Sequence, residues 1–283
     1  MASFIDLHIH TDMSDGADTP AEVLEKVVRQ GIRTFAVTDH DNIAGSQAIE
    51  DRVPEGYRLI RGIEFSCREN NWKCHILGYG FDPADSRFRK ALETARQLRL
   101  ENLEKRLVYL EEHKIRLSEE EKAWLRSQPS PAKPHLGNVL VARGLADDLD
   151  TAIARYINPC KTGDSRIEAE LAVKGIRGAG GIPVWAHPLG GEGEKRIDTN
   201  EFKKRLAVLM DYGIRGLECF YSRYSEKEIT FLLEQAAAHG LLVSGGSDYH
   251  GGNKKGISLG MLNTADAPVD PARLTVLKAL GMG

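Results

Sequence analysis

Residues 4–10 read FIDLHIH, an apolar run of strand length that places His8 and His10 two positions apart. Side chains at positions i and i+2 of a strand point to the same face, so both imidazoles can reach one metal ion. Similar short apolar runs recur along the chain. The expected strands cover residues 4–10, 34–38, 58–65, 74–79, 182–186, 214–220 and 241–245.

Helical patterns lie between several of these runs. Thr19 followed by Pro20 and Glu22 is typical of a helix start, with a capping hydroxyl, a first-turn proline and an early acidic residue. The strands lack sustained polar alternation, as expected where helices cover both faces of a parallel sheet. We therefore expect an α/β fold, and seven strands favour a barrel over an open sheet.

The alternation breaks in the middle of the chain. Apolar residues recur at helical spacing from Phe88 to Leu110, which predicts a long amphipathic helix. A second helical stretch follows Ser118, and a third follows a proline-rich segment at residues 129–134. We expect one barrel interrupted by a helical cap, with these boundaries: barrel, 1–87 and 166–283; cap, 88–165.

The composition excludes several classes of protein. The 283 residues are 41% hydrophobic and 28% charged, with a net charge of −3, as in an ordinary globular protein. The sequence has no run of 18 apolar residues and no signal-peptide pattern, so we expect no membrane association. Four cysteines without C-x-x-C spacing favour a reduced, cytoplasmic protein. The slightly acidic balance argues against bulk duplex DNA binding, and nothing in the sequence fixes the oligomeric state.

Residues of the kind that bind metals end or follow nearly every expected strand. Because the ends of parallel strands converge on one face of a barrel, these side chains would gather in one basin. Crowded together without metal, they would leave costly unpaired groups, whereas two or three divalent ions would make them ligands. The nine candidates are His8, His10, Asp15, His40, Glu64, His75, His187, Asp248 and His250.

These motifs together resemble the PHP (polymerase and histidinol phosphatase) family of metal-dependent phosphoesterases, and more closely its TrpH-like or YciV-like branch. The matching stretches span nearly the whole chain in the family's order. They are residues 6–11, 14–16, 38–41, 62–64, 75–78, 179–181, 186–188 and 245–248. The resemblance implies a distorted, TIM-like (β/α)7 barrel with an inserted all-helical cap.

The resemblance also implies a trinuclear metal centre. It assigns a first ion to His8, His10, Glu64 and Asp248, a second to Asp15, His40 and His250, and a third to His75 and His187 with Glu64 bridging. The seven residues of this set expected to act in catalysis are His8, His10, Asp15, His40, Glu64, Asp248 and His250. Nitrogen and oxygen ligands without thiolate suit manganese, iron or zinc, so we expect two or three such ions as cofactors.

The expected reaction is hydrolysis of a small phosphate ester by a hydroxide that bridges two metal ions. The resemblance favours a nucleotide, a nucleoside 3′,5′-bisphosphate or the 5′ end of a short oligonucleotide as substrate. A cyclic phosphate (of a sugar or nucleotide) or a sugar phosphate is the alternative. More remote alternatives are an amidohydrolase-type enzyme, which would carry a bridging lysine at a central strand end, and a catalytically silent module that binds metal or nucleic acid.

The cap is expected to select the substrate. Lys133 and His135 lie in a Lys-Pro-His stretch where the branch usually has Arg-Pro-His, so a point charge replaces a planar guanidinium group. Arg96 and Arg99 on the first cap helix are candidates to bind a second phosphate, although isolated charges on helices most often face solvent.

Further candidates lie at the rim of the barrel. Tyr221 and Arg223 follow the sixth expected strand and are placed to contact a sugar or base. His187 or His135 is a candidate proton donor to the leaving group. Asp39 and Asp41 flank His40 and either orient the imidazoles or cap the turn.

Overall fold

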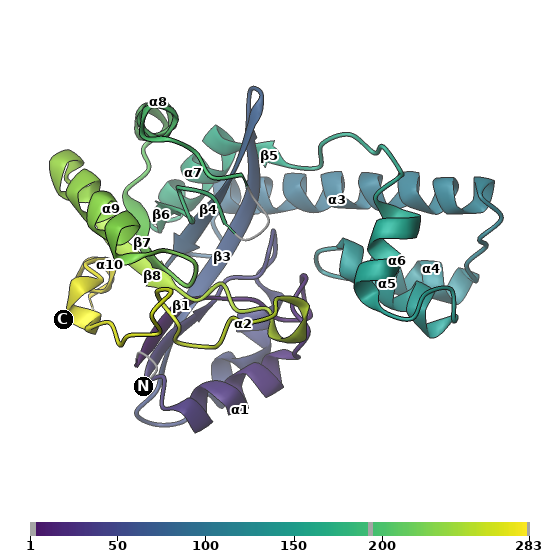
Figure 1. The fold of residues 1–283 in the computed structure, drawn as a ribbon, viewed down its shortest axis with the longest axis horizontal. Coiled ribbons are helices and arrows are strands. Elements are labelled where there is room, and N and C mark those ends of the chain that lie inside the picture. The colour runs from purple at the N-terminus through teal and green to yellow at the C-terminus, as the bar shows by residue number, and fades with distance from the viewer. Residues whose placement is uncertain (1–3, 192–194, 282–283) are drawn as a thin grey trace.

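The computed structural model of the protein describes residues 4–191 and 195–281. Within these residues, one sheet curves into a nearly closed barrel with helices outside it, which confirms the expected fold class (Figure 1). A short additional strand, β5 (Ile167–Glu168), pairs with β3. In spatial order the barrel strands are β1 (Ile5–Ile9), β2 (Thr34–Val37), β3 (Arg58–Glu69), β4 (Trp72–Tyr79), β6 (Ile182–Trp185), β7 (Gly216–Tyr221) and β8 (Leu242–Gly246).

The strands are not all parallel, which differs from the expected parallel barrel. β1, β2 and β3 are parallel to one another, and so are β6, β7 and β8, but β4 is antiparallel to both of its neighbours. A tight hairpin joins β3 to β4, with Asn70 at a φ of 50°. The barrel closes where the Asp248 amide donates to the His8 carbonyl at 2.8 Å and the His10 amide to the Tyr249 carbonyl at 2.9 Å.

Helices surround the barrel, and the first of them begins where the sequence predicts. In α1 (Pro20–Gln30) the Thr19 hydroxyl accepts from the Glu22 amide and the Glu22 carboxylate accepts from the Thr19 amide, a capping box. The other helices of the barrel are α2 (Ala44–Ile49), α7 (Ala169–Gly178), α8 (Thr199–Tyr212), α9 (Glu226–His239) and α10 (Val276–Ala279), with single-turn helices at Glu50–Arg52, Gly251–Asn253 and Pro271–Arg273.

The cap extends to one side of the barrel (Figure 1). It comprises α3 (Ser86–Glu112), α4 (Glu119–Ser127), α5 (Lys133–Ala142) and α6 (Leu149–Ala152), which continues as a π-helical turn at Ile153–Ile157. The first half of α3 packs on α7 through buried residues such as Phe88 and Ala91, whereas its second half packs in a separate apolar cluster with α4 and α5. Helix α3 therefore connects the barrel to the cap.

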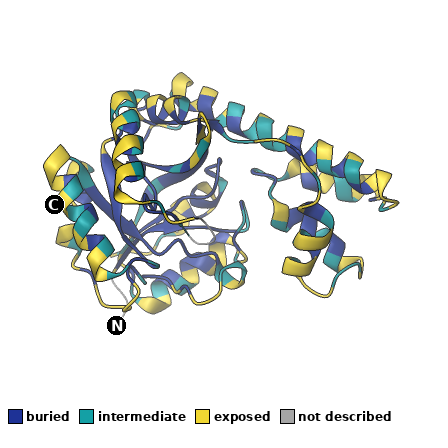
Figure 2. Cartoon of the chain, turned by 45° about the horizontal axis from the view of Figure 1, so that its top comes forward, coloured by how far each residue is buried: buried dark blue, intermediate teal, exposed yellow. Residues whose placement is uncertain are grey.

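The barrel and the cap each have an apolar core of their own. Figure 2 shows buried residues in the barrel strands and a second buried set where α3, α4 and α5 meet. The cap cluster includes Leu103, Leu107, Leu125 and Leu136, and full burial of a leucine contributes about 1.5–3 kcal/mol. Among the described residues, no helix combines the length and apolar character needed to span a membrane.

Candidate metal centre

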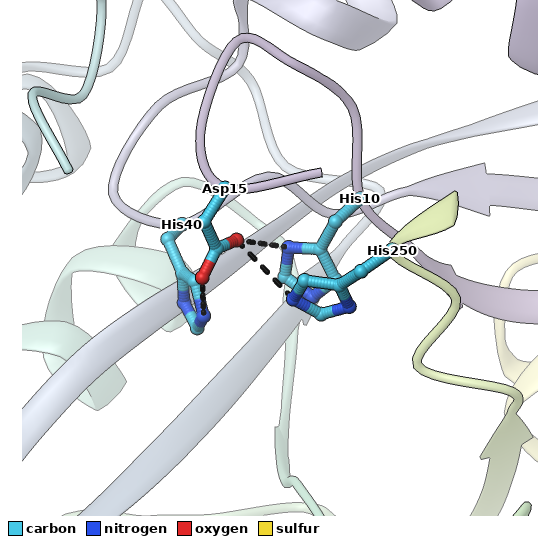
Figure 3. Close-up of side chains that lie close together, drawn as sticks. All are labelled: His10, Asp15, His40 and His250. Atoms are coloured by element: carbon cyan, nitrogen blue, oxygen red, sulfur yellow. Dashed lines mark ion pairs between the residues drawn. The ribbon is translucent and has the colours of Figure 1, made fainter. Parts of the chain in front are cut away.

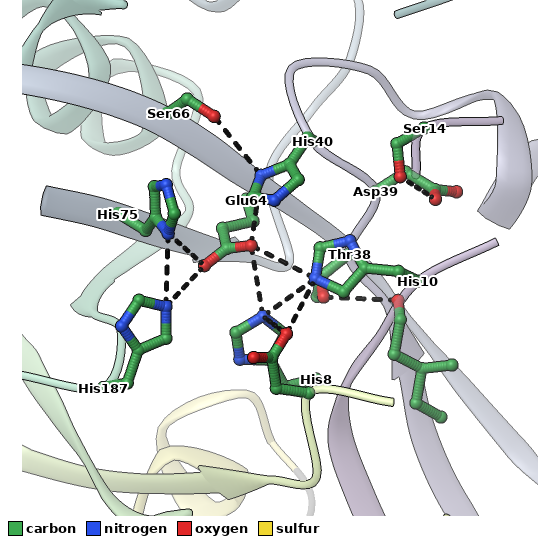
Figure 4. A network of polar contacts seen from close by, with 12 residues as sticks. His8, His10, Ser14, Thr38, Asp39, His40, Glu64, Ser66, His75 and His187 are labelled. Carbon is green, nitrogen blue, oxygen red and sulfur yellow. Dashed lines mark hydrogen bonds and ion pairs between the residues drawn. The ribbon is translucent and has the colours of Figure 1, made fainter. Parts of the chain in front are cut away.

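The nine candidate ligands lie together in the barrel. Figure 4 shows six of them, namely His8, His10, His40, Glu64, His75 and His187. The strand alternation that places Ile5, Leu7 and Ile9 in the apolar core turns His8 to the other face, toward the centre of the barrel mouth. Asp15 and His75 are partly exposed, and the other seven are buried. Their ligand atoms form three groups, defined in turn below, in each of which all the atoms lie within 4.8 Å of one another.

The first group is His8, His10, Glu64 and Asp248. The Nε2 atoms of His8 and His10 lie 3.1 Å apart. Glu64 Oε2 lies 3.2 Å from His8 Nε2 and 3.1 Å from His10 Nε2. Asp248 Oδ1 lies 3.5 Å and 3.3 Å from the same two nitrogens. Two imidazole nitrogens and two carboxylate oxygens therefore surround one point.

The second group is Asp15, His40 and His250, joined by His10 (Figure 3). Asp15 Oδ1 lies 3.2 Å from His250 Nε2 and 3.7 Å from His10 Nδ1. Asp15 Oδ2 lies 3.7 Å from His40 Nε2. His10 turns one ring nitrogen to each of the first two groups, an arrangement that the sequence did not predict.

The third group is Glu64, His75 and His187. Glu64 Oε1 lies 3.4 Å from His75 Nδ1 and 3.2 Å from His187 Nε2. The other oxygen, Oε2, faces the first group. Glu64 therefore lies between two groups, in the bridging position that the resemblance implies for it.

The side chains present fit divalent metal ions. His10 Nδ1, Glu64 Oε2 and His250 Nε2 are buried without a hydrogen-bond partner, and each faces one of the three groups. Buried polar atoms without partners cost free energy, and an ion coordinated by these atoms removes that cost. All the ligand atoms are nitrogen or oxygen, a mixed set that suits manganese, iron or zinc more than calcium or magnesium.

Glu218 of β7 orients two ligands and was not among the predicted site residues. Its Oε1 lies 2.9 Å from His8 Nδ1, and its Oε2 accepts from the His187 amide at 2.7 Å. The carboxylate is fully buried. By accepting a hydrogen bond from Nδ1, it leaves His8 Nε2 free to bind a metal ion. The sequence signal that could have identified Glu218 is a glutamate inside an otherwise apolar strand.

Two further buried aspartates hold the loops that carry ligands. Asp39 accepts from the Thr11 amide at 2.8 Å and from the Ser14 hydroxyl at 2.7 Å, which fixes the loop leading to Asp15. Asp6 accepts from the Ser247 amide at 2.9 Å and so anchors the loop that begins after β8. Asp39 thus fixes the loop of a neighbouring strand rather than contacting an imidazole directly.

Asp41 links the metal centre to the cap. Its Oδ2 accepts from Arg99 Nε at 2.6 Å, and its Oδ1 accepts from the Ser66 amide at 2.9 Å. Arg99 also donates to the Ser66 hydroxyl at 3.0 Å, and that hydroxyl lies 3.3 Å from His40 Nδ1. Arg99 of α3 is therefore connected through Ser66 to a candidate ligand of the second group.

The backbone is strained at three positions of the site. Asp41, His187 and Asp248 have φ values of 54°, 29° and 59°, in the left-handed region that side chains other than glycine rarely adopt. Gly246 meets a different constraint, because a Cβ there would collide with the backbone and Cβ of His8. The close approach of β8 to β1 therefore requires glycine.

When no metal is bound, the histidines and carboxylates of the centre shift one another's pKa values. Burial favours the neutral form of His10, but the adjacent carboxylates of Asp248 and Glu64 raise its pKa to about 9. Burial also opposes ionisation of Glu64, yet His8, His40 and His75 hold its pKa well below the usual value. The pKa of His8 is raised as well, whereas burial lowers the pKa of His40 and His250. Protons on His8 and His10 therefore balance part of the carboxylate charge, and a metal ion would have to displace these protons.

A chamber of about 810 Å³ lies between the metal centre and the cap. Asp15, His40 and His75 line it on the barrel side. Of the predicted substrate-binding residues, Lys133 and Arg99 line the chamber. Lys133 Nζ donates to Asn158 Oδ1 at 2.7 Å.

Three other predicted residues have different neighbours. His135 accepts from the Ala132 amide through Nδ1 and donates to the Asp12 carbonyl through Nε2, each at 3.0 Å, so it joins α5 to the loop after β1. Tyr221 donates to Asp248 Oδ2 at 3.0 Å. Arg223 donates to the Lys255 carbonyl at 2.9 Å, in the loop after β8. The structure does not place these three side chains among those that line the chamber.

The family model for the PHP domain matches residues 6–156, and these residues carry six of the candidate ligands. The chain belongs to the PHP family. It is 30% identical over 269 residues to a 3′,5′-nucleoside bisphosphate phosphatase of Chromobacterium violaceum, covering 93% of this chain and 92% of the relative. It is 30% identical to a 5′-3′ exoribonuclease of Haemophilus influenzae, covering 88% of this chain and 91% of the relative.

A third relative hydrolyses a different ester. The chain is 29% identical to a phosphoribosyl 1,2-cyclic phosphate 1,2-diphosphodiesterase of Eggerthella lenta, covering 87% of this chain and 94% of the relative. All three relatives are phosphoesterases that match over nearly their whole length. This PHP protein is accordingly an enzyme of the metal-dependent phosphoesterase class, as the sequence predicts.

A solved structure has the same fold over almost the whole chain. A Chromobacterium violaceum protein, described as an amidohydrolase with bound sulfate and no metal, superposes with a TM-score of 0.78 at 26% identity. The superposition covers 99% of this chain and 96% of that protein. Its cap and barrel therefore correspond to those of this PHP protein.

Proposed function

We propose that this PHP protein hydrolyses a phosphate ester of a substrate that carries a second phosphate, namely a nucleoside 3′,5′-bisphosphate. The observation that carries the proposal is the charge of the chamber beside the metal centre. Among its described lining residues, Asp15 is the one carboxylate. Six are cationic: Lys73, Arg99, Arg106, Lys133, Lys161 and Arg166.

The cations of the chamber are close enough to affect one another. Burial lowers the pKa of Lys133, and the nearby charges of Arg106, Arg166, Lys73 and Lys161 lower it further. Side chains of like charge repel when no anion lies between them. A phosphate group in the chamber would remove this repulsion.

Two of these arginines have hydrogen-bond donors that lack partners. Arg106 Nε and Arg166 Nε are buried, and neither has a hydrogen-bond partner among the described residues. Burying a charged donor without an acceptor is costly, and guanidinium groups bind phosphate oxygens well. These two donors support a second phosphate subsite in the chamber.

The three groups of candidate ligands would hold two or three manganese, iron or zinc ions. The chemistry that such ions supply is Lewis acidity, which activates water and offsets the charge that develops on the phosphoryl group. The protein's own part is to orient the ligands. Glu218 holds His8 in one orientation, and Ser66, itself held by Arg99, lies beside His40 Nδ1.

The structure argues against both predicted candidates for the proton donor to the leaving group, His135 and His187. Both ring nitrogens of His135 are engaged with backbone groups, and burial lowers its pKa, so it is held neutral as a link between cap and barrel. His187 is a candidate ligand of the third group. We therefore assign neither residue as the donor.

Two other classes of phosphate ester are also candidate substrates. The exoribonuclease relative makes a short oligonucleotide a second candidate, since its 5′ nucleotide also has phosphates on both sides of one ribose. The cyclic phosphodiesterase relative keeps a cyclic phosphate in consideration. An amidohydrolase-type reaction is less well supported, because Glu64 of β3, rather than a lysine, lies at the bridging position.

The test is a panel of phosphate-release assays with metal-loaded protein. The panel contains adenosine 3′,5′-bisphosphate, adenosine 5′-monophosphate, a 5′-phosphorylated trinucleotide, cyclic phosphates and sugar phosphates. We expect the highest kcat/KM with the bisphosphate. Equal kcat/KM for the bisphosphate and the monophosphate would contradict the second phosphate subsite, and no release from any ester would contradict the enzyme assignment.

Substitution of the two arginines tests the subsite directly. Loss of a hydrogen bond to a charged group costs about 1.5–3 kcal/mol, so Arg106→Met or Arg166→Met should raise KM for the bisphosphate about 10- to 100-fold. The monophosphate should be affected much less. Arg89→Met is the matched control, since Arg89 lies exposed on α3 outside the chamber.

A further inference from the structure

Lys254 reaches the metal centre from the loop that follows β8, a position that the sequence did not single out. Its Nζ lies 2.7 Å from Asp248 Oδ2. It also lines a small cavity of about 30 Å³ with His40, Glu64, His75, His187, Gly191 and Asp248. These ligands come from all three groups, so the ammonium group lies beside the place where the groups meet.

Asp248 engages one of the N–H donors of Lys254. Asp248 Oδ2 already accepts a hydrogen bond from the Tyr221 hydroxyl, and Oδ1 faces His8 and His10. An ammonium group has three N–H donors, and among the described residues Lys254 donates one hydrogen bond, to Asp248. Its remaining donors are available to a ligand in the cavity.

The charge of the loaded centre favours an anion near Lys254. The candidate ligands include three carboxylates, which carry less charge than two or three divalent ions. Lys254 adds another positive charge beside the same ligands, and like charges in a partly buried site repel strongly. A phosphoryl group between the ions and the ammonium group would turn this repulsion into attraction.

The loop holds Lys254 in place from both sides. The Asn253 side-chain amide donates to the Asp15 carbonyl at 2.8 Å. On the other side, Arg223 donates to the Lys255 carbonyl at 2.9 Å. Lys255 itself is exposed, although it is the next residue in the chain. The loop therefore directs one of two adjacent lysines toward the metal centre.

We infer that Lys254 binds the phosphoryl group that undergoes hydrolysis, donating a hydrogen bond to one of its non-bridging oxygens. The inference rests on the proposed phosphoesterase function and deepens it. Lys254 acts at the reacting phosphate, whereas Arg106 and Arg166 act at the second one. A compact ammonium group suits this role, because it can approach phosphate as a point charge beside metal ions.

The experiment measures binding of inorganic phosphate to metal-loaded protein by isothermal titration calorimetry. The variants are Lys254→Met, Lys254→Arg and the control Lys255→Met, and the metal content of each is measured by plasma mass spectrometry. We expect Lys254→Met to retain its metal ions and to bind phosphate at least tenfold more weakly. Lys254→Arg should recover part of that affinity, and Lys255→Met should match the wild type.

Three other outcomes would contradict either the inference or the proposed function. Phosphate affinity that is unchanged in Lys254→Met overturns the inference. Loss of metal from Lys254→Met also overturns it, because Lys254 would then act only by positioning Asp248. If the wild-type protein itself binds metal but no phosphate, the proposed function fails rather than the role of Lys254 within it.

Discussion

Replacing Arg99 by methionine tests whether the cap helix is coupled to the metal centre. Arg99 Nε lies 2.6 Å from Asp41 Oδ2, and the two side chains are 14% and 1% exposed. Methionine keeps much of the apolar stem but removes the charge. The substitution leaves the buried Asp41 carboxylate with the Ser66 amide as its remaining donor among the described residues.

The size of the effect follows from this burial. Breaking a buried ion pair by removing one partner costs about 3–5 kcal/mol, because the other charge stays buried without compensation. Since Asp41 keeps its bond to the Ser66 amide, we expect the lower end, about 3 kcal/mol. The double variant Arg99→Met/Asp41→Asn removes the stranded charge, and asparagine tolerates the left-handed backbone at this position. It should regain about 2 kcal/mol of the loss.

The assay is urea unfolding of the metal-free protein, with the wild type, both single variants and the double variant forming a double-mutant cycle. A second readout is metal content, because Ser66 beside His40 loses its bond from Arg99. The reasoning is refuted if Arg99→Met changes the free energy of unfolding by less than about 0.5 kcal/mol, the range of ordinary surface substitutions. It is also refuted if the double variant is as unstable as the sum of the single variants.

Three further predictions follow from other parts of the site. In the metal-free protein the pKa of His10 is raised from 6.5 to about 9, so the stability it contributes is fully present below pH 6.5 and is lost as pH rises through 9. Urea unfolding at intervals across this range should show a loss of about 3 kcal/mol, which metal-loaded protein should not show, and a metal-free protein of constant stability would contradict the assignment. His75→Ala should reduce the bound metal by one ion per chain, measured by plasma mass spectrometry, whereas the exposed control His113→Ala should not; equal metal content in both variants would argue against the third group. Gly246→Ala should lower stability by about 1–3 kcal/mol and weaken metal binding, because its Cβ collides with His8. The control is Gly252→Ala, where an added Cβ meets no close neighbour. Equal effects of the two substitutions would show that the close approach of β8 to β1 is unimportant.

The positions of the ligands were predictable because strand alternation and strand ends are local features. His8 lies on β1 and His10 directly follows that strand, two positions further on, while Asp248 follows an apolar run that forms β8. The direction of β4 was not predicted, because the polar residues at the ends of β3 and β4 resemble a loop. Asn70, which adopts positive φ more readily than most residues, is the local signal for the hairpin.

Contacts between residues that lie far apart in the sequence could not be predicted. Glu218 contacts His8 across 210 residues of sequence, and Asp41 contacts Arg99 across 58. No periodicity relates such pairs. Lys254 lies in a glycine-rich loop beside an equally charged neighbour, so only the three-dimensional structure distinguishes the two lysines. The division of the chain at residues 88 and 165 remains a prediction, since α3 packs against both parts.

The central claim is that nine converging side chains hold divalent ions that hydrolyse a phosphate ester. The most direct measurement is phosphate release from adenosine 3′,5′-bisphosphate while metal-free protein is titrated with manganese, with bound metal determined at each point. The account predicts no release without metal and a rate that rises until two or three ions are bound per chain, then stays constant. Release that is independent of bound metal, or full metal occupancy without release of phosphate, would contradict it.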